Sequence, residues 1–214
     1  AKWGACSCAT FTKTHVDPDG TMGIDAGFAG KGDELWACYL TGSQMTIAHK
    51  GPSGAWSSAL VAKGSGCAMA VTASGVHMVY GKHEVANHPK VTVGKLSGTT
   101  LEGAVQPEGS VDRNGYQPAI ASQGGTLYVS SAHIKGTDDY ALRYFAQPAG
   151  GSWSAEVVTP LPDTTFDQSV TVCDNGTPII AYLKYDGNLW SSRLAKGPAP
   201  WTTEVLDDSS EKIG

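Results

Sequence analysis

The chain repeats itself every 45 to 52 residues, and this period constrains its fold more than any other feature. Each copy ends in a short extended segment that begins with a large apolar residue. These anchors are Phe11, Trp56, Leu101, Trp153 and Trp201. Each copy contains four short stretches of period-two alternation, with Gly, Asn or Asp at the joints. A period of this size, built from short strands, is typical of β-propeller blades.

The last copy illustrates the pattern. It predicts strands over 168–173, 178–183, 189–195 and from Trp201 onward, with Asn175-Gly176 at one of the turns. The tryptophans Trp56, Trp153 and Trp201 recur at one blade position. A repeated position favours packing between blades over ligand stacking.

The composition also favours strands over helices. The 214 residues include 27 Gly and 11 Pro, and only 16% are charged, whereas helices are rich in Glu and Lys. We predict one all-β domain over 1–214, a β-propeller of four-stranded antiparallel blades. Residues 1–16 supply an outer half-blade and 207–214 begin a further strand. The four full blades span 17–61, 62–106, 107–158 and 159–206.

About four and a half blades fit into this chain, which leaves two arrangements open. In the first, a five-bladed ring closes on itself. In the second, the chain is part of a larger ring completed by another chain.

Charge and hydropathy exclude two classes of partner. The formal net charge is −5, and the arginines Arg113, Arg143 and Arg193 are spread along the chain. Tracking phosphates requires clustered basic residues, so nucleic acid is not expected. No apolar run approaches the roughly 18 residues of a membrane-spanning helix, so no membrane span is expected either.

The cysteines indicate an oxidising compartment. The chain has five cysteines, Cys6, Cys8, Cys38, Cys67 and Cys173, which permit at most two internal disulfides. Their spacing matches no zinc ribbon. The chain starts at Ala1 without an apolar leader, which fits a mature secreted protein or a trimmed chain. We expect at least one disulfide and a secreted or periplasmic location.

The last repeat resembles a known family. Asn175-Gly-Thr-Pro-Ile-Ile-Ala-Tyr182, followed by Asp186-Gly-Asn-Leu-Trp190, is similar to the repeat of bacterial sialidase-like (BNR-like) β-propellers. The resemblance covers nearly the whole chain and implies the propeller fold. It says little about function, because such propellers serve as lectins, lyases, hydrolases and adhesion modules.

Sialidase activity is not expected from this sequence. For a sialidase, the resemblance would imply a site with three convergent arginines, an acid and a tyrosine nucleophile. Here Arg143 and Arg193 fall in equivalent third strands, which leaves Arg113 as the loop arginine. The SxDxGxxW aspartate box is absent as well.

Candidate ligand-binding residues gather on the face formed by the loops between blades and between second and third strands. Aligning the second strands on Tyr80, Ser130 and Tyr182 gives one equivalent position three residues later. The candidates at and near this position are His83, His133, Tyr185 and His88. The inter-blade loops add the carboxylates of Asp112, Asp163 and Asp167. Imidazoles beside carboxylates bind metals, transfer protons or hydrogen-bond sugar hydroxyls, although solvated loops have the same composition.

No motif identifies a cofactor. Asp17-Pro-Asp19-Gly20 lacks the remaining ligands of a calcium loop. Neither calcium nor a transition metal is therefore supported by a motif, and no catalytic residue is assigned.

Three functions remain open. The repeats favour a non-enzymatic, lectin-like or adhesion module that recognises carbohydrate or another surface ligand through several shallow sites. The second hypothesis is a polysaccharide lyase or hydrolase that uses the histidines and loop carboxylates. The third is a propeller subunit whose open blade ends self-associate or bind a partner chain.

Overall fold

The computed structural model describes residues 26–52, 54–85, 88–107, 115–135, 139–159, 164–185 and 190–207. Within these ranges the chain forms fifteen strands and no helix, which confirms the predicted all-β class. The strand pairings are antiparallel. A helix long and apolar enough to cross a membrane does not occur in these ranges.

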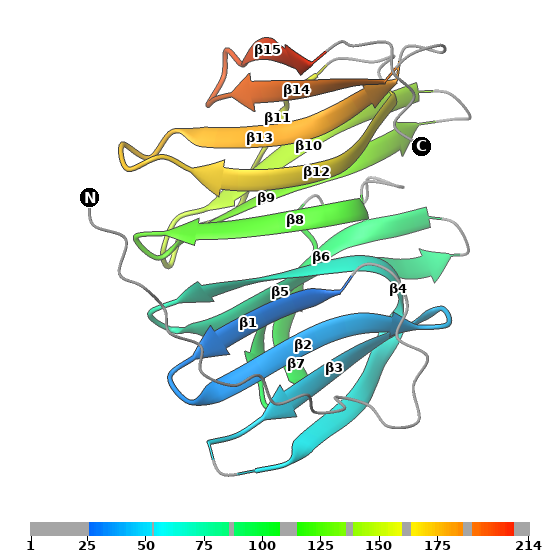
Figure 1. The fold of residues 1–214 in the computed structure, drawn as a ribbon, viewed down its shortest axis with the longest axis vertical. Helices are drawn as coiled ribbons and strands as arrows, with labels where there is room; N and C mark the ends of the chain where they lie inside the picture. Colours follow the sequence, from blue (N-terminus) through cyan, green and yellow to red (C-terminus); the bar gives the residue numbers. More distant parts are fainter. Residues whose placement is uncertain are drawn as a thin grey trace.

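The strands form one seven-stranded and two four-stranded sheets. Because two blades share one strand of the first sheet, these sheets make four successive four-stranded blades (Figure 1). Blade 1 contains β1 (Gly27–Lys31), β2 (Glu34–Thr41), β3 (Gln44–Lys50) and the first half of β4 (Trp56–Thr72). Blade 2 contains the second half of β4, β5 (Gly75–Val85), β6 (His88–Ser97) and β7 (Thr100–Val105). Blade 3 contains β8 (Tyr116–Gln123), β9 (Thr126–Lys135), β10 (Asp139–Gln147) and β11 (Ser154–Val157). Blade 4 contains β12 (Thr164–Val172), β13 (Pro178–Tyr185), β14 (Trp190–Lys196) and β15 (Thr202–Asp207).

One strand joins the first two blades without a loop. β4 pairs with β3 through residues 56–63 and with β5 through residues 64–72. The sequence instead predicts a break between two strands here. The strand continues through a β-bulge, because the pairing register shifts between Ser65 and Cys67 and Gly66 takes up the bend with a φ of 51°.

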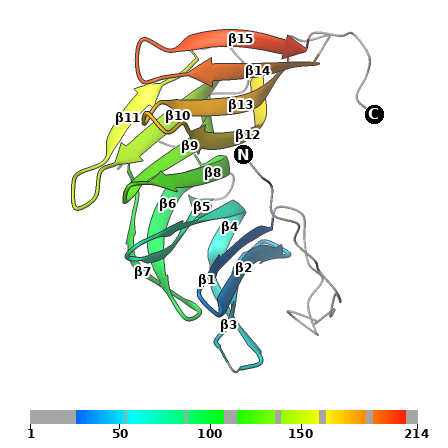
Figure 2. The same ribbon diagram turned by 60° about the vertical axis from the view of Figure 1, so that its left-hand side comes forward.

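The hydrophobic core lies between blades, which stack face to face in chain order (Figure 2). One cluster joins blades 1 and 2 around Met78 and Ile47, and a second joins blades 2 and 3 around Val79 and Val129. A third joins blades 3 and 4 around Ile180.

β2 is buried at four consecutive positions. Trp36 and Cys38 belong to the cluster with blade 2, and Ala37 and Tyr39 belong to a small cluster with Ala48.

Each blade has two ends. At the hairpin end, short connections join the first strand to the second and the third to the fourth. At the loop end, the second strand turns into the third and each blade continues into the next.

A disulfide fastens blade 1 to blade 2. Cys38 of β2 and Cys67 of β4 are bonded and buried, which confirms the prediction of at least one disulfide. Cys173 is a free, exposed thiol, and Cys6 and Cys8 lie outside the described residues.

Candidate functional site

A cavity of about 330 Å³ lies at the loop end, between the second half of β4 and the first residues of β8 and β12. Its lining includes Gly66, Gln117, Asp167 and Gln168. We call it the inner-strand cavity. It brings together three blades at the point where each enters its first strand.

Each of these inner strands is irregular at the cavity. The pairing register shifts within 65–67, 116–119 and 166–169. Gly66, Gln117 and Asp167 have φ values of 51°, 44° and 49°. Glycine adopts this conformation freely, whereas a non-glycine residue there costs about 1 kcal/mol or more. Such strain concentrates at functional sites, so two strained side chains on one cavity mark it as a candidate.

Gln117 holds Asp167 in place from the neighbouring blade. Gln117 Nε2 donates to Asp167 Oδ1 at 2.8 Å, and the backbone N–H of Asp167 donates to Gln117 Oε1 at 3.1 Å. No hydrogen bond to Asp167 Oδ2 occurs within the described part of the chain. An exposed carboxylate is thus fixed at the cavity with one oxygen available to a ligand.

Gln168 adds a buried acceptor to the same cavity. Its Nε2 donates to the carbonyl oxygens of Tyr116, at 3.0 Å, and of Gln117. The side chain is 7% exposed. Its Oε1 has no hydrogen-bond partner among the described residues. A buried amide oxygen without a partner is destabilising by about 1–3 kcal/mol, and a ligand hydroxyl would relieve that cost.

The strand register corrects the alignment of the candidate histidines. If the equivalent bulge residues Gly66, Gln117 and Asp167 are superposed, Ser131 rather than Ser130 corresponds to Tyr80 and Tyr182. The equivalents of His83 are then residues 134 and 185. His133 therefore stands one residue earlier, on the opposite side of its strand.

In the corrected alignment, His83 of blade 2 and His133 of blade 3 point toward the seam between these two blades. His83 follows Val79 on one side of β5, and His133 follows Val129 on one side of β9. Val79 and Val129 belong to the cluster between blades 2 and 3. Alternation along each strand therefore directs both imidazoles into the seam between these blades, at the loop end.

The imidazole of His83 has a nitrogen that no described residue hydrogen-bonds. It is half-buried, and burial lowers its pKa. Its Nε2 is buried and has no hydrogen-bond partner within the described ranges. A neutral imidazole offers one acceptor and one donor.

The remaining predicted residues are placed as follows. Tyr185 ends β13 and is partly exposed. His88 begins β6, but its side chain is not described. Asp112 and Asp163 lie outside the described residues.

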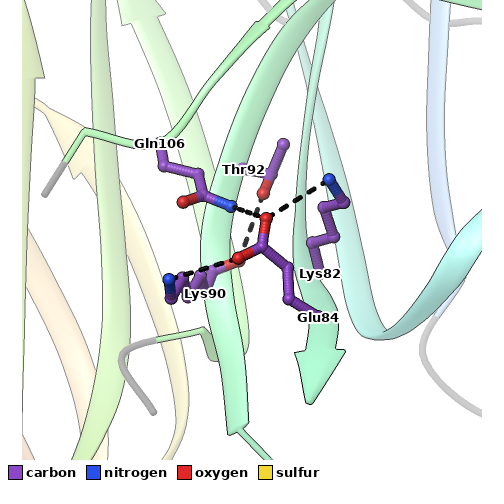
Figure 3. Close-up of polar contacts among 5 residues, drawn as sticks. All are labelled: Lys82, Glu84, Lys90, Thr92 and Gln106. Atoms are coloured by element: carbon purple, nitrogen blue, oxygen red, sulfur yellow. Dashed lines mark hydrogen bonds and ion pairs between the residues drawn. The ribbon is translucent and has the colours of Figure 1, made fainter. Parts of the chain in front are cut away.

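Glu84, a second carboxylate at the loop end, is occupied by its neighbours (Figure 3). Its Oε2 accepts from Lys90 Nζ at 3.2 Å, and its Oε1 accepts from Gln106 Nε2 at 2.9 Å and Lys82 Nζ at 3.4 Å. The hydrogen bond from Lys90, followed by those from Gln106 and Lys82, lowers the pKa of Glu84. Burial, with the nearby Glu84 charge, raises the pKa of Tyr80 to about 12. This cluster stabilises blade 2 and leaves Glu84 poorly suited to act as an acid.

A metal centre is not built by the described residues. No group of three or more His, Cys, Asp or Glu side chains converges there. The chemistry of the inner-strand cavity is that of a carboxylate and amides.

Sequence reasoning identified Asp167 but missed Gln117 and Gln168. One sequence signal could have found this site. Gln117 and Asp167 are polar residues that occupy, in their own repeats, the position that Gly66 occupies in the second repeat. That equivalence depends on bulges, which the alternation pattern does not reveal.

Comparisons with known proteins identify the fold. No protein-family model and no curated protein matches the sequence. Among solved structures, the chain is similar to an endo-arabinase from Bacteroides thetaiotaomicron, with a TM-score of 0.56 at 8% identity, over 86% of this chain and 81% of that one. It is also similar to a bifunctional GH43-CE protein from Bacteroides eggerthii, with a TM-score of 0.54 at 9% identity, over 84% and 25%.

The NanB sialidase of Streptococcus pneumoniae is a third similar structure. Its TM-score is 0.51 at 14% identity, over 72% of this chain and 26% of that one. The chain thus spans about a quarter of the length of the GH43-CE protein and of NanB. These likenesses confirm the β-propeller fold and, at the level of the fold, the resemblance to sialidase-like propellers.

The comparisons overturn the preferred function. We expected a non-enzymatic binding module, but the structures that share this fold are mainly glycoside hydrolases, including the endo-arabinase and the GH43-CE protein. Repetition of blades does not separate lectins from enzymes, because propellers of this kind serve as both. The prediction of a lectin-like module is wrong, and the hydrolase alternative fits the findings better.

Proposed function

We propose that the chain is a glycoside hydrolase that works at the inner-strand cavity. The observation that carries the proposal is the Asp167 carboxylate, held by Gln117 in a strained conformation beside the unpaired Oε1 of Gln168. Hydrolysis of a glycosidic bond needs a positioned carboxylate and acceptors for sugar hydroxyls. The cavity supplies both.

Asp167 is proposed as the carboxylate that acts in its ionised form, as base or nucleophile. Its Oδ1 already accepts an amide hydrogen bond, so Oδ2 is the reactive oxygen. Glycoside hydrolysis pairs such a group with a carboxylic acid that protonates the leaving oxygen. We propose Asp112 or Asp163 for that role, because they precede β8 and β12 in the sequence.

The proposed substrate is a neutral glycan. The described lining of the cavity holds no lysine or arginine beside Asp167, so nothing there would pair with a sugar carboxylate. Gln168 Oε1 would accept from a hydroxyl. We further propose a secreted or periplasmic location, in keeping with the Cys38–Cys67 disulfide.

The test is hydrolysis of a panel of neutral polysaccharides and aryl glycosides, including arabinan, xylan and galactan. Asp167→Asn keeps the shape of the side chain and removes its charge. We expect kcat to fall by roughly 100-fold or more. The matched control is Asp174→Asn, an exposed turn residue at the hairpin end, and it should leave kcat unchanged. Equal activity of Asp167→Asn and the unaltered chain, or no cleavage of any glycan, would refute the proposal.

A further inference from the structure

Three cavities with shared lining residues adjoin one another at the hairpin end, opposite the inner-strand cavity. Their volumes are about 760, 390 and 290 Å³. The first and second share Lys95 and Glu102, and the second and third share His77, Leu127 and Gln147. We call this the hairpin-end groove. It runs from blade 1 across blade 2 to blade 3, and cavities of this size suit small ligands.

Charges in the groove balance. Lys31 and Lys95 face Glu34 and Glu102 along the lining. Glu34 Oε2 already accepts from His49 Nε2 at 3.1 Å, and Lys31 Nζ donates to the carbonyl oxygen of Ala73 at 2.7 Å. The formal charges of these four lining residues therefore sum to zero.

Lys95 and Glu102 carry the unused polar groups at the centre of the groove. They are cross-strand neighbours on β6 and β7. Neither side chain makes a hydrogen bond or ion pair within the described part of the chain. The stem of Lys95 packs over Gly75, where an added Cβ would lie 2.6 Å from Lys95 Cε. A donor and an acceptor are thus presented side by side.

Trp153 adds an unpaired donor. Its indole Nε1 is buried and has no partner among the described residues, although the ring lines the second cavity. The equivalent Trp201 donates to Glu156 Oε2 of the preceding blade at 2.7 Å. In blade 3, Glu156 of the fourth strand pairs with Tyr144 of the third strand. At the equivalent place in blade 2, Val105 of the fourth strand pairs with Val93 of the third. Val105 therefore occupies the position of that acceptor and leaves the Trp153 N–H without one.

We propose that the hairpin-end groove binds a neutral oligosaccharide chain, as a second glycan site separate from the inner-strand cavity. A sugar hydroxyl both donates and accepts, so one ligand can serve Lys95 and Glu102 together. The apolar walls at Leu127 and Val105 suit the C–H faces of sugar rings. A hydroxyl entering beside Val105 would supply the missing acceptor for Trp153.

His77 is consistent with an uncharged ligand. Burial, with the charges of Lys95 and Lys31, lowers its pKa. Its ring is therefore neutral at pH 7 and able to accept or donate.

The test measures binding, and it is independent of hydrolysis. Isothermal titration uses the full chain with Asp167→Asn, so that the ligand survives. The probes are short linear arabino-, xylo- and galacto-oligosaccharides, an oligouronate and an unrelated peptide. Lys95→Ala and Glu102→Gln should each weaken binding of a neutral oligosaccharide about tenfold.

Matched controls separate the groove from general effects. Lys196 occupies the third-strand position of blade 4 that Lys95 occupies in blade 2, so Lys196→Ala should leave affinity unchanged. Trp153→Phe should weaken binding, whereas Trp56→Phe removes an equally unpaired indole N–H outside the groove and should have no effect.

Two results would overturn the proposal. The first is the absence of neutral-oligosaccharide binding, or tighter binding of the oligouronate or the peptide. The second is equal affinity in the groove variants and their controls. Either leaves the hydrolysis measurements on Asp167→Asn untouched, so failure of this site and failure of the proposed hydrolase are distinguishable.

Discussion

Substituting the recurring tryptophans by phenylalanine should have unequal costs, although the same atoms are removed each time. Trp201 donates to the Glu156 carboxylate at 2.7 Å, whereas the indole N–H groups of Trp153 and Trp56 are buried without partners in the described structure. The loss of ring area is similar in all three variants. Differences between them therefore report the hydrogen bond.

The expected difference follows from two opposite terms. A hydrogen bond to a charged group contributes about 1.5–3 kcal/mol, and Trp201→Phe loses it. Trp153→Phe instead removes a buried unpaired donor, whose burial costs about 1–3 kcal/mol. Because Glu156 is partly exposed, solvent reduces the first term. We expect Trp201→Phe to lower the free energy of unfolding by about 2–3 kcal/mol more than Trp153→Phe.

Urea unfolding followed by far-ultraviolet circular dichroism gives these free energies without relying on tryptophan emission. In thermal unfolding the same difference corresponds to about 5–10 °C in Tm. Glu156→Ala, alone and combined with Trp201→Phe, completes a double-mutant cycle that isolates the pair. Equal losses in Trp201→Phe and Trp153→Phe would show that packing alone explains the repeated tryptophan.

Further predictions concern the disulfide, the pH dependence and the inner-strand cavity. Cys38 and Cys67 are 29 residues apart in sequence, and replacing both by Ala should lower the free energy of unfolding by about 3–4 kcal/mol in urea titrations. Burial lowers the pKa of His83 from 6.5 in the folded chain, so the unfolded chain binds the proton first and the free energy of unfolding falls as pH drops below about 6.5. His83→Gln should make the free energy of unfolding depend less on pH in this range. An unchanged pH dependence would contradict the burial of a neutral His83. Gln117→Ala removes both hydrogen bonds to Asp167 and should lower kcat about 10- to 100-fold; a change in KM alone would assign Gln117 to substrate binding instead.

Much of the fold could be predicted because its signals are local. The predicted strand over 178–183 is observed as β13, and the predicted strand over 189–195 as β14. Alternation and turn residues act within a few positions of the chain, so each repeat indicates its own strands. The break expected before Cys67 is absent, because Gly64-Ser65-Gly66 forms a bulge within β4 instead of a loop.

The candidate site could be predicted only in part. Asp167 was found as a loop carboxylate, but its partner Gln117 is 50 residues away, and no local pattern links the two. The histidine alignment was wrong by one residue, because Gly75 is the first residue of β5 whereas Gly125 lies in the turn before β9. A glycine near the start of a second strand therefore does not mark the same position in both blades. A one-residue shift places a side chain on the other face of its sheet.

The sequence by itself determined the β-propeller, because its period, its glycines and its alternation are properties of neighbouring residues. Only the tertiary structure decided which side chains from different blades meet. Gln117 reaches Asp167 and Trp201 reaches Glu156 across blade seams, whereas Val105 leaves Trp153 without an acceptor. Such contacts depend on how whole sheets pack and where they bulge, and that geometry is a property of the assembled blades.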